Sequence, residues 1–300
     1  MHYAVDVPER TFLPPDSVQT ILPRAQVALP SGDISYVDVG RGTPIVLLHG
    51  APMTSIGFIR VIQALRPNYR VIVPDFPGFG YSRAAVNFGS SLCEYGQFIA
   101  EFLETLKLSD AVLFLNDSST CMGFHAAPKI GGRLRALVVA DTVALPMTGQ
   151  LRIVSFALRS IIGSKVMYYL NRNLNLIPWM VATLAPMWHP FSKQIRRMMT
   201  SQFDSAEKRD RLLHVFRQMG SDAGFMNQAA ERAQQYFSHL PVLLLYGQFD
   251  PMRLLGSIER LRKLFTNTRT VIVAAEEHFP ILGSGAKVGD AIDRFVSGIK

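Results

Sequence analysis

The sequence has few cysteines and few charged residues, and it lacks the long apolar runs of a membrane protein. Two of its 300 residues are cysteine, Cys93 and Cys121. They are too few for a disulfide framework and fit a reducing compartment or two buried thiols. Charged residues make up 18% of the chain and hydrophobic residues 48%, which excludes disorder and provides an ample core. With no secretory pattern at the N-terminus and no apolar run of transmembrane length, we expect a cytoplasmic protein without a transmembrane segment.

The net charge of +8 is concentrated in one region. Residues 150–220 contain eleven lysines or arginines and three acidic residues, so the rest of the chain is neutral overall. Such a region attracts an anionic substrate or an anionic membrane surface, although a solvated helical surface is the simpler interpretation. The sequence has no nucleic-acid-binding motif and no alternation of basic and aromatic residues. We therefore expect no nucleic-acid partner.

Short apolar runs alternate with helical patterns over most of the chain. Runs typical of buried strands occupy residues 44–48, 69–74, 111–115, 136–140, 241–246 and 270–274. Helical spacing is found at residues 58–65, 92–106, 121–127 and 254–265 and from Val288 onward. A hairpin of residues 25–29 and 33–39 precedes them. This order predicts an α/β protein with a mostly parallel sheet that helices cover on both faces.

The alternation of strands and helices stops in the middle of the chain. Residues 143–238 are apolar, rich in methionine and helical in spacing, with interruptions at prolines. They predict an all-helical insertion. The α/β core then consists of residues 1–142 and 239–300.

The strand predicted at residues 111–115 runs into small polar residues, Asn116-Asp117-Ser118-Ser119-Thr120, and then into a helix. A sharp turn from a buried strand to a helix presents one side chain at the tip of the strand, beside the free N–H groups of the helix. This is the geometry of a nucleophile elbow, whose common pattern is Gly-x-Ser-x-Gly. The usual spacing places Asp117 at the tip, where a serine is more common.

From this elbow the chain resembles the α/β-hydrolase family, and specifically its aspartate-nucleophile branch of epoxide hydrolases and haloalkane dehalogenases. Leu115 and Ser119 replace the glycines that usually flank the nucleophile. The resemblance covers nearly the whole chain outside the N-terminal segment and the insertion. It implies the α/β-hydrolase fold, with the helical insertion as a cap over the active site.

Two further polar residues, Asp250 and His278, follow predicted strands. The carboxyl ends of parallel strands meet at the ligand-binding edge of a sheet, and the order nucleophile, acid, base is that of this fold. Asp141 also ends a strand and is a rival acid, ranked lower because the Gly-Gln-Phe-Asp-Pro context of Asp250 matches the family better. In the predicted mechanism Asp117 forms an alkyl ester, which water activated by His278 then hydrolyses.

Residues His49-Gly50-Ala51-Pro52 directly follow a predicted strand and resemble the family's His-Gly-x-Pro loop. The backbone N–H groups of Ala51 and Ser118 are the expected oxyanion-hole donors, and His49 is expected at the substrate. The sequence contains no metal-ligand cluster and no cofactor fingerprint, and the predicted chemistry requires neither.

Departures from the family concern the substrate. Dehalogenases of the family normally carry Trp directly after the nucleophile and often Asn after His-Gly, where this chain has Ser118 and Ala51. Epoxide hydrolases of the family use cap tyrosines whose O–H donates to the epoxide oxygen. The predicted cap supplies five aromatic candidates for substrate contact, each with packing as its alternative role: Tyr168, Tyr169, Trp179, Trp188 and Tyr236.

The leading hypothesis is an epoxide hydrolase that acts on a lipophilic small molecule with water as co-substrate. The alternatives are a serine esterase with Ser118 or Ser119 as nucleophile, a haloalkane or haloacid dehalogenase, and a non-catalytic protein of the same fold that binds a ligand or a partner. Homo-oligomerisation is left open by the sequence.

Overall fold

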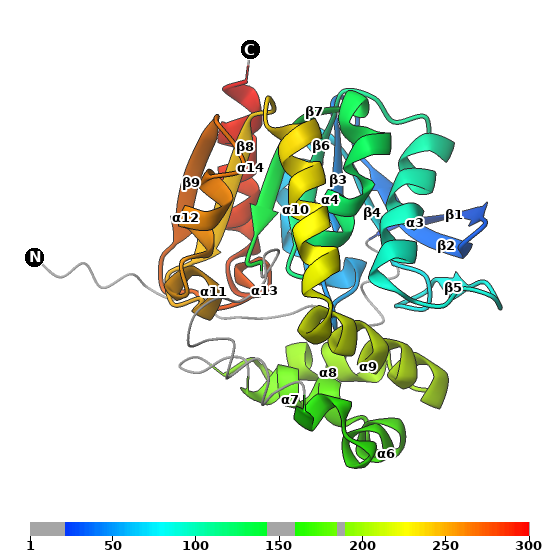
Figure 1. Ribbon diagram of the computed structural model, residues 1–300. Coiled ribbons are helices and arrows are strands. Elements are labelled where there is room, and N and C mark those ends of the chain that lie inside the picture. Colours follow the sequence, from blue (N-terminus) through cyan, green and yellow to red (C-terminus); the bar gives the residue numbers. More distant parts are fainter. Residues whose placement is uncertain (1–21, 143–159, 185–189, 300) are drawn as a thin grey trace, which may run out of the picture.

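The computed structural model describes residues 22–142, 160–184 and 190–299. Among these residues, nine strands form one sheet in the order β1-β2-β4-β3-β6-β7-β8-β9, with β5 paired to β2 at one edge (Figure 1). The strands are β1 (Arg24–Leu29), β2 (Gly32–Val39), β3 (Pro44–Leu48), β4 (Arg70–Pro74), β5 (Arg83–Ala84), β6 (Ala111–Asn116), β7 (Leu134–Ala140), β8 (Val242–Gly247) and β9 (Thr268–Val273).

The sheet is mostly parallel. β1 and β2 form the predicted hairpin, β2 pairs antiparallel with β4, and every neighbouring pair from β4 to β9 is parallel. Every residue of β6 is buried, because helices cover both faces of a parallel sheet. The predicted α/β fold with a mostly parallel sheet is confirmed.

Helices cover the two faces of the sheet and give it two cores. One face carries α3 (Leu92–Thr105), α4 (Ser119–Ile130) and α10 (Ala223–Phe237), and the other carries α2 (Ile59–Leu65) and α14 (Gly285–Ser297). Successive residues of β6 point to opposite faces, so Leu113 and Leu115 pack in the first core and Val112 and Phe114 in the second. Each such side chain contributes roughly 1.5–3 kcal/mol when fully buried.

The predicted helices are present, with differences at their ends. α3 begins with a capping box, in which the Ser91 hydroxyl accepts from the Glu94 N–H and the Glu94 carboxylate accepts from the Ser91 N–H. The helix predicted at residues 254–265 is present as α12 (Ser257–Arg262), which is shorter at both ends, and a separate short helix, α11 (Pro251–Leu254), precedes it. Gly256 separates them because its φ of +79° is left-handed and ends the first helix.

The described part of the insertion is helical. Four of its helices lie beyond the sheet on the side of α11 and α13 (Pro280–Gly283), which follow β8 and β9 (Figure 1). These four helices are α6 (Lys165–Leu174), α7 (Leu176–Leu184), α8 (Lys193–Ser201) and α9 (Ala206–Ser221). α10 differs from them, because it packs along α4 of the core. The boundaries predicted for the insertion stay a prediction, since residues 143–159 lie outside the described residues.

Two short 3-10 helices are also present, η1 (Ser55–Phe58) after β3 and η2 (Gly131–Arg133) after α4. Within the described ranges, no helix is both long enough and apolar enough to cross a bilayer.

Candidate active site

Asp117 lies at the sharp turn between β6 and α4. Its backbone is left-handed, with φ of +49°, which is uncommon for a residue other than glycine. The Asp117 N–H donates to the carbonyl of Ala140 on β7 at 3.0 Å, and the Asp117 carbonyl accepts from the Thr120 N–H at 3.1 Å and the Thr142 hydroxyl at 3.0 Å. The neighbouring strand and the first turn of α4 thus hold the turn in this conformation, which presents the carboxylate at the end of the sheet.

Gly50 allows the loop after β3 to pass directly against Asp117. A Cβ atom at position 50 would lie 2.6 Å from the Asp117 Cβ and 2.8 Å from the Asn116 carbonyl oxygen, closer than such atoms approach. Glycine is therefore required at this position by the close approach of two chain segments.

The three residues predicted to carry the chemistry come together. Asp250 follows β8 and His278 follows β9. His278 Nδ1 lies 3.2 Å from Asp250 Oδ1, and His278 Nε2 lies 3.8 Å from Asp117 Oδ1. Asp250 Oδ1 also accepts from the Met252 N–H at 2.7 Å, so the start of α11 fixes the carboxylate that orients the imidazole.

The three groups influence each other's protonation. Burial raises the pKa of Asp117 to about 6, and the neighbouring His278 opposes that rise. Burial lowers the pKa of His278, but Asp250 and Asp117 together raise it above its ordinary value. Burial also acts to raise the pKa of Asp250, yet the attraction of His278 outweighs it and the pKa is lowered. At neutral pH Asp117 is therefore mostly an anion facing a basic imidazole.

The two expected oxyanion donors are arranged around one hydroxyl. The Ala51 N–H donates to Ser118 Oγ at 2.9 Å. The Ser118 hydroxyl and the Ser118 backbone N–H both face the Asp117 carboxylate and act to lower its pKa. Ser118 thus contacts the carboxylate directly, and Ala51 acts on it through the Ser118 hydroxyl. From the sequence, Ser118 was expected to act through its backbone N–H or as a nucleophile, and this role of its side chain was not predicted.

Ser119, the other serine considered as a nucleophile, points into the core. Its Oγ accepts from the Asn116 N–H at 2.8 Å and lies within donating distance of the Leu48 and Asn116 carbonyls, at 3.1 and 2.8 Å. The side chain is fully buried. These contacts fix the elbow and leave Ser119 away from His278.

His49 lies behind the site as a buried link between two loops. His49 Nε2 accepts from the Phe76 N–H at 3.0 Å, and Nδ1 lies 3.1 Å from the Gly50 carbonyl. Burial lowers the pKa of His49, so the ring is neutral, and acceptance at Nε2 places its proton on Nδ1. His49 therefore holds the loop after β3 against the loop after β4.

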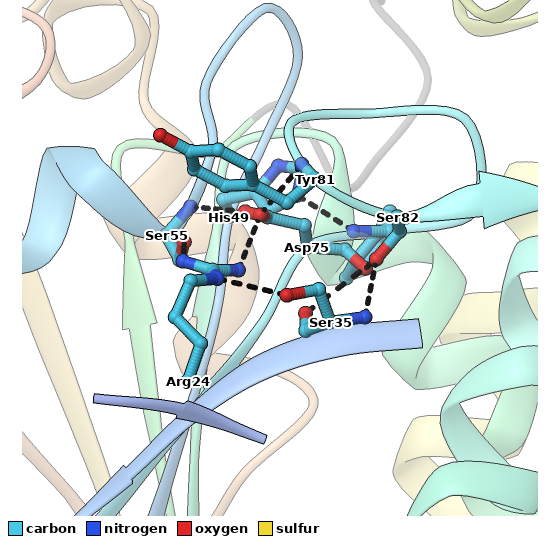
Figure 2. A network of polar contacts seen from close by, with 8 residues as sticks. Arg24, Ser35, His49, Ser55, Asp75, Tyr81 and Ser82 are labelled. Atoms are coloured by element: carbon cyan, nitrogen blue, oxygen red, sulfur yellow. Dashed lines mark hydrogen bonds and ion pairs between the residues drawn. The ribbon is translucent and has the colours of Figure 1, made fainter. Parts of the chain in front are cut away.

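Asp75 gathers the same two loops and β1 into one polar network (Figure 2). Asp75 Oδ2 is 2.6 Å from Arg24 Nη2 and accepts from the Tyr81 N–H at 3.0 Å, while Oδ1 accepts from the Ser55 N–H at 2.7 Å. Arg24 Nη1 also donates to Ser55 Oγ at 2.9 Å. No local motif in the sequence joins Arg24, Ser55 and Asp75, so this network was not predicted.

The cap tyrosines do not gather at Asp117. Tyr168 and Tyr169 on α6 are 39% and 66% exposed, and Tyr168 lines a separate cavity of about 540 Å³ between α6, α9 and residues 88–90. Tyr236 on α10 lies against Gly131, at the end of α4 opposite the elbow.

Trp179 on α7 is 52% exposed, and Trp188 lies outside the described residues. The roles predicted for both stay predictions.

The cap residues that do approach the site are apolar and come from α8 and its flanks. Phe279 lies 4.2 Å from the His278 ring, between ring centres, and Phe191 lies 6.4 Å from Phe279. Phe203 packs against Phe79 at 5.9 Å. The spacing of apolar residues along residues 191–203 could have indicated a buried helix face, but not which part of the core it would cover.

One hydrogen bond ties the cap to the loop after β3. Gln202 Nε2 donates to the Pro52 carbonyl at 2.7 Å. Pro52 follows Ala51, the residue whose N–H reaches Ser118. The cap is thereby connected to the loop that surrounds the Asp117 carboxylate.

The chain matches a known family. A sequence profile described as alpha/beta hydrolase fold matches residues 43–284, and the chain therefore belongs to the α/β-hydrolase fold family. The solved structure of haloalkane dehalogenase DbeA from Bradyrhizobium elkani USDA94 is similar, with a TM-score of 0.81 at 18% identity over 93% of this chain and 98% of that one. The epoxide hydrolase CorEH gives a TM-score of 0.77 at 20% identity, over 93% and 100%.

Two curated relatives are similar to this chain in sequence. Haloalkane dehalogenase 2 of Mycobacterium tuberculosis (strain ATCC 25618 / H37Rv) is 35% identical over 111 residues, which is 37% of this chain and 39% of the relative. The match therefore spans about two fifths of that protein. The cis-3-alkyl-4-alkyloxetan-2-one decarboxylase of Shewanella oneidensis is 24% identical over 244 residues, 78% of this chain and 76% of the relative.

Proposed function

We propose that this protein is a hydrolase in which Asp117 attacks an electrophilic carbon and forms an alkyl ester with the substrate. The observation that carries the proposal is the placement of His278 between two carboxylates, 3.2 Å from Asp250 and 3.8 Å from Asp117. A serine mechanism needs the imidazole at a hydroxyl. Here the imidazole faces a carboxylate at the tip of the elbow, which favours Asp117 over Ser118 and Ser119.

The first step needs no base. An Asp117 oxygen attacks the substrate carbon, a C–O bond forms, and the leaving group departs with the electron pair of the broken bond. Because the pKa of Asp117 is about 6, its carboxylate is largely ionised at neutral pH and yet more basic than an ordinary aspartate.

The second step hydrolyses the ester. His278 Nε2 takes a proton from water, whose oxygen attacks the carbonyl carbon of the Asp117 ester, and the imidazolium then gives the proton to the departing alkoxide, which leaves as an alcohol. Ester formation removes the negative charge of Asp117, one of the two charges that raise the pKa of His278. The imidazole therefore becomes easier to keep neutral at the stage where it acts as a base. The Ser118 donors that hold the carboxylate are placed to hold the oxyanion as well.

The surroundings favour a lipophilic substrate whose leaving group is stable as an anion. Phe279 packs against the His278 ring, Phe191 packs against Phe279, and Phe203 packs against Phe79, so the side chains around the site are apolar. An opening epoxide releases an alkoxide, which needs a proton donor, and among the described tyrosines those of the cap lie elsewhere. A haloalkane releases halide, and a strained lactone attacked at its alkyl carbon releases a carboxylate, so neither needs that donor.

The lactone class has further support from the Shewanella relative, whose name states an oxetan-2-one substrate and which matches 78% of this chain. Ser118 stands where a halide-binding Trp is normal in dehalogenases, which weakens the haloalkane assignment. The epoxide hydrolase hypothesis stays a prediction and is tested beside them.

A trapping experiment tests the mechanism. His278→Gln should still form the ester but fail to hydrolyse it, so mass spectrometry after incubation with a haloalkane, an epoxide, a β-lactone and an activated ester should find an adduct on the peptide that contains Asp117. Asp117→Asn should give no adduct, and Asp204→Asn, an exposed acid on the cap, should behave as the wild type. An adduct on Ser118, or ester cleavage that persists in Asp117→Asn, would contradict the proposal.

A further inference from the structure

A second buried carboxyl group lies beside Asp250. Asp141 directly follows β7, is fully buried and has a left-handed φ of +47°. Its N–H donates to the Leu245 carbonyl at 3.2 Å, and its Oδ1 accepts from the Gly247 N–H at 3.4 Å. Because β7 and β8 are parallel neighbours, Asp141 and Asp250 arrive at the same edge of the sheet.

One carboxylate oxygen of each side chain has no N–H or hydroxyl partner among the described residues. Asp141 Oδ2 and Asp250 Oδ2 are both buried, and no N–H or other hydroxyl group in the described part of the chain reaches either of them. The two side chains lie close enough for each to shift the pKa of the other through a side-chain interaction. Two ionised carboxylates contain no proton to donate and would repel each other in a buried site. One member of the pair must therefore hold a proton.

The surroundings place that proton on Asp141. Asp250 has His278 and the Met252 N–H as charge-stabilising partners, whereas Asp141 has the longer bond from Gly247. Burial, and next the charge of Asp250, raise the pKa of Asp141 well above its ordinary value. The other titratable groups near the pair are Asp117, which also raises it, and the buried phenol of Tyr246.

We propose that Asp141 is a positioning residue that stays protonated and donates a hydrogen bond to Asp250 Oδ2, fixing the carboxylate that orients His278. This inference rests on the proposed function. One oxygen of Asp250 then binds His278 and the Met252 N–H, and the other binds the Asp141 hydroxyl, so the carboxylate cannot rotate. The pair carries a single negative charge, which the imidazolium formed in the hydrolytic step can neutralise.

Two substitutions separate the donor role from mere packing. Asp141→Asn keeps an N–H donor and tolerates the left-handed backbone, and Asp141→Gly keeps the backbone but removes the donor. We expect the rate of ester hydrolysis to stay within about threefold of the wild type in Asp141→Asn. In Asp141→Gly it should fall on the order of tenfold, the usual effect of removing a hydrogen bond to a charged group. The acid limb of the pH profile of ester hydrolysis in Asp141→Gly should also move to higher pH, because Asp250 loses a hydrogen-bond donor. Equal losses in the two variants, or an intact rate in Asp141→Gly, would overturn the proposal.

Infrared spectroscopy tests the proton without any substrate. At about pH 8, where Asp117 is ionised, the wild type should show the carbonyl band of one buried carboxylic acid. The band should persist in Asp117→Asn and vanish in Asp141→Asn. Absence of the band in the wild type, or its survival in Asp141→Asn, would overturn the assignment. If the wild type turns over no substrate, the proposed function fails while this measurement still decides whether Asp141 holds a proton.

Discussion

At the residue scale, Asp117 is less stable as an anion in the folded chain than in the unfolded one. Its folded pKa of about 6 lies above the ordinary value of 3.8, so its ionisation opposes folding as the pH rises through this interval. We predict that Asp117→Asn raises the free energy of unfolding by about 2–3 kcal/mol at neutral pH, from 1.36 kcal/mol per pKa unit. The gain should disappear below about pH 4, where the carboxyl is protonated in both states. Denaturant unfolding at neutral pH and below about pH 4 measures the gain and its disappearance.

Asp110→Asn is the matched control for this prediction. Asp110 shares the left-handed backbone of Asp117, with φ of +53°, but its side chain is 69% exposed and pairs with Arg135 at 3.3 Å. We expect its free energy of unfolding to change by less than about 1 kcal/mol. A loss of stability in Asp117→Asn at neutral pH would mean that the carboxylate stabilises the fold.

The same pKa predicts the pH dependence of ester formation. Only the ionised carboxylate attacks, so the rate of the first turnover should fall on the acid side with a midpoint of about pH 6. Rapid-quench measurement of the adduct in His278→Gln isolates this step. Because His278 itself lowers the pKa of Asp117, the midpoint in that variant should lie above the wild-type value. A midpoint near pH 4 would show that Asp117 is not raised.

The sequence predicted Asp117, Asp250 and His278 because each follows a strand, and parallel strands bring their ends to one edge. The orientation of Ser118 Oγ toward Asp117 depends on Ala51, which is 67 residues away. Such contacts depend on how distant segments pack, which periodicity does not reveal. The tyrosines of the predicted cap show the same limit, since helical spacing predicts a helix but not which of its faces turns toward the core.

At the element scale, Asp75 joins β1, the loop after β3 and the loop after β4. Removing it leaves the Arg24 guanidinium, whose side chain is 17% exposed, without its carboxylate, and leaves the Ser55 and Tyr81 N–H groups without their acceptor. Breaking one partner of a buried pair typically costs about 3–5 kcal/mol. We predict a loss of that size in the free energy of unfolding of Asp75→Ala, measured by denaturant unfolding.

The control for Asp75 is an ion pair on the surface. Asp204 and Lys208 lie 3.2 Å apart on the cap, with the Asp204 side chain 67% exposed, so Asp204→Ala should change the free energy of unfolding by less than about 1 kcal/mol. The Asp75 network also holds the loop that carries Ala51. Asp75→Ala should therefore slow ester hydrolysis at temperatures where the variant is still folded. Equal losses of unfolding free energy in Asp75→Ala and Asp204→Ala would show that the Asp75 network stabilises the fold no more than a surface ion pair does.

The fold was more predictable from sequence than the connections within it. Buried parallel strands appear as unbroken apolar runs, so β3, β6, β7 and β8 were found close to their actual ends. The helix after β8 was predicted with less accurate ends, because Gly256 can continue a helix or end it, and only its left-handed φ in the folded chain decides between the two.

At the scale of the whole molecule, the cap and the core meet over the site through Gln202. Its Nε2 donates to the Pro52 carbonyl, while its Oε1 is buried without a partner in the described part of the chain. Gln202→Leu removes the bond to the loop and also the unpaired oxygen. The two changes oppose each other in stability, so we expect the free energy of unfolding to move by less than about 1 kcal/mol.

Catalysis should respond where stability does not. Without the bond from Gln202, the loop of Ala51 and Pro52 is held less firmly from the cap side, and the Ser118 hydroxyl that accepts from Ala51 loses part of its orientation. A hydrogen bond contributes about 1 kcal/mol, so we predict that kcat/KM of Gln202→Leu falls about fivefold. Gln228→Leu, an exposed glutamine on α10, is the control and should leave kcat/KM unchanged. If Gln202→Leu keeps the wild-type kcat/KM, the cap covers the site without helping to position the loop beside Asp117.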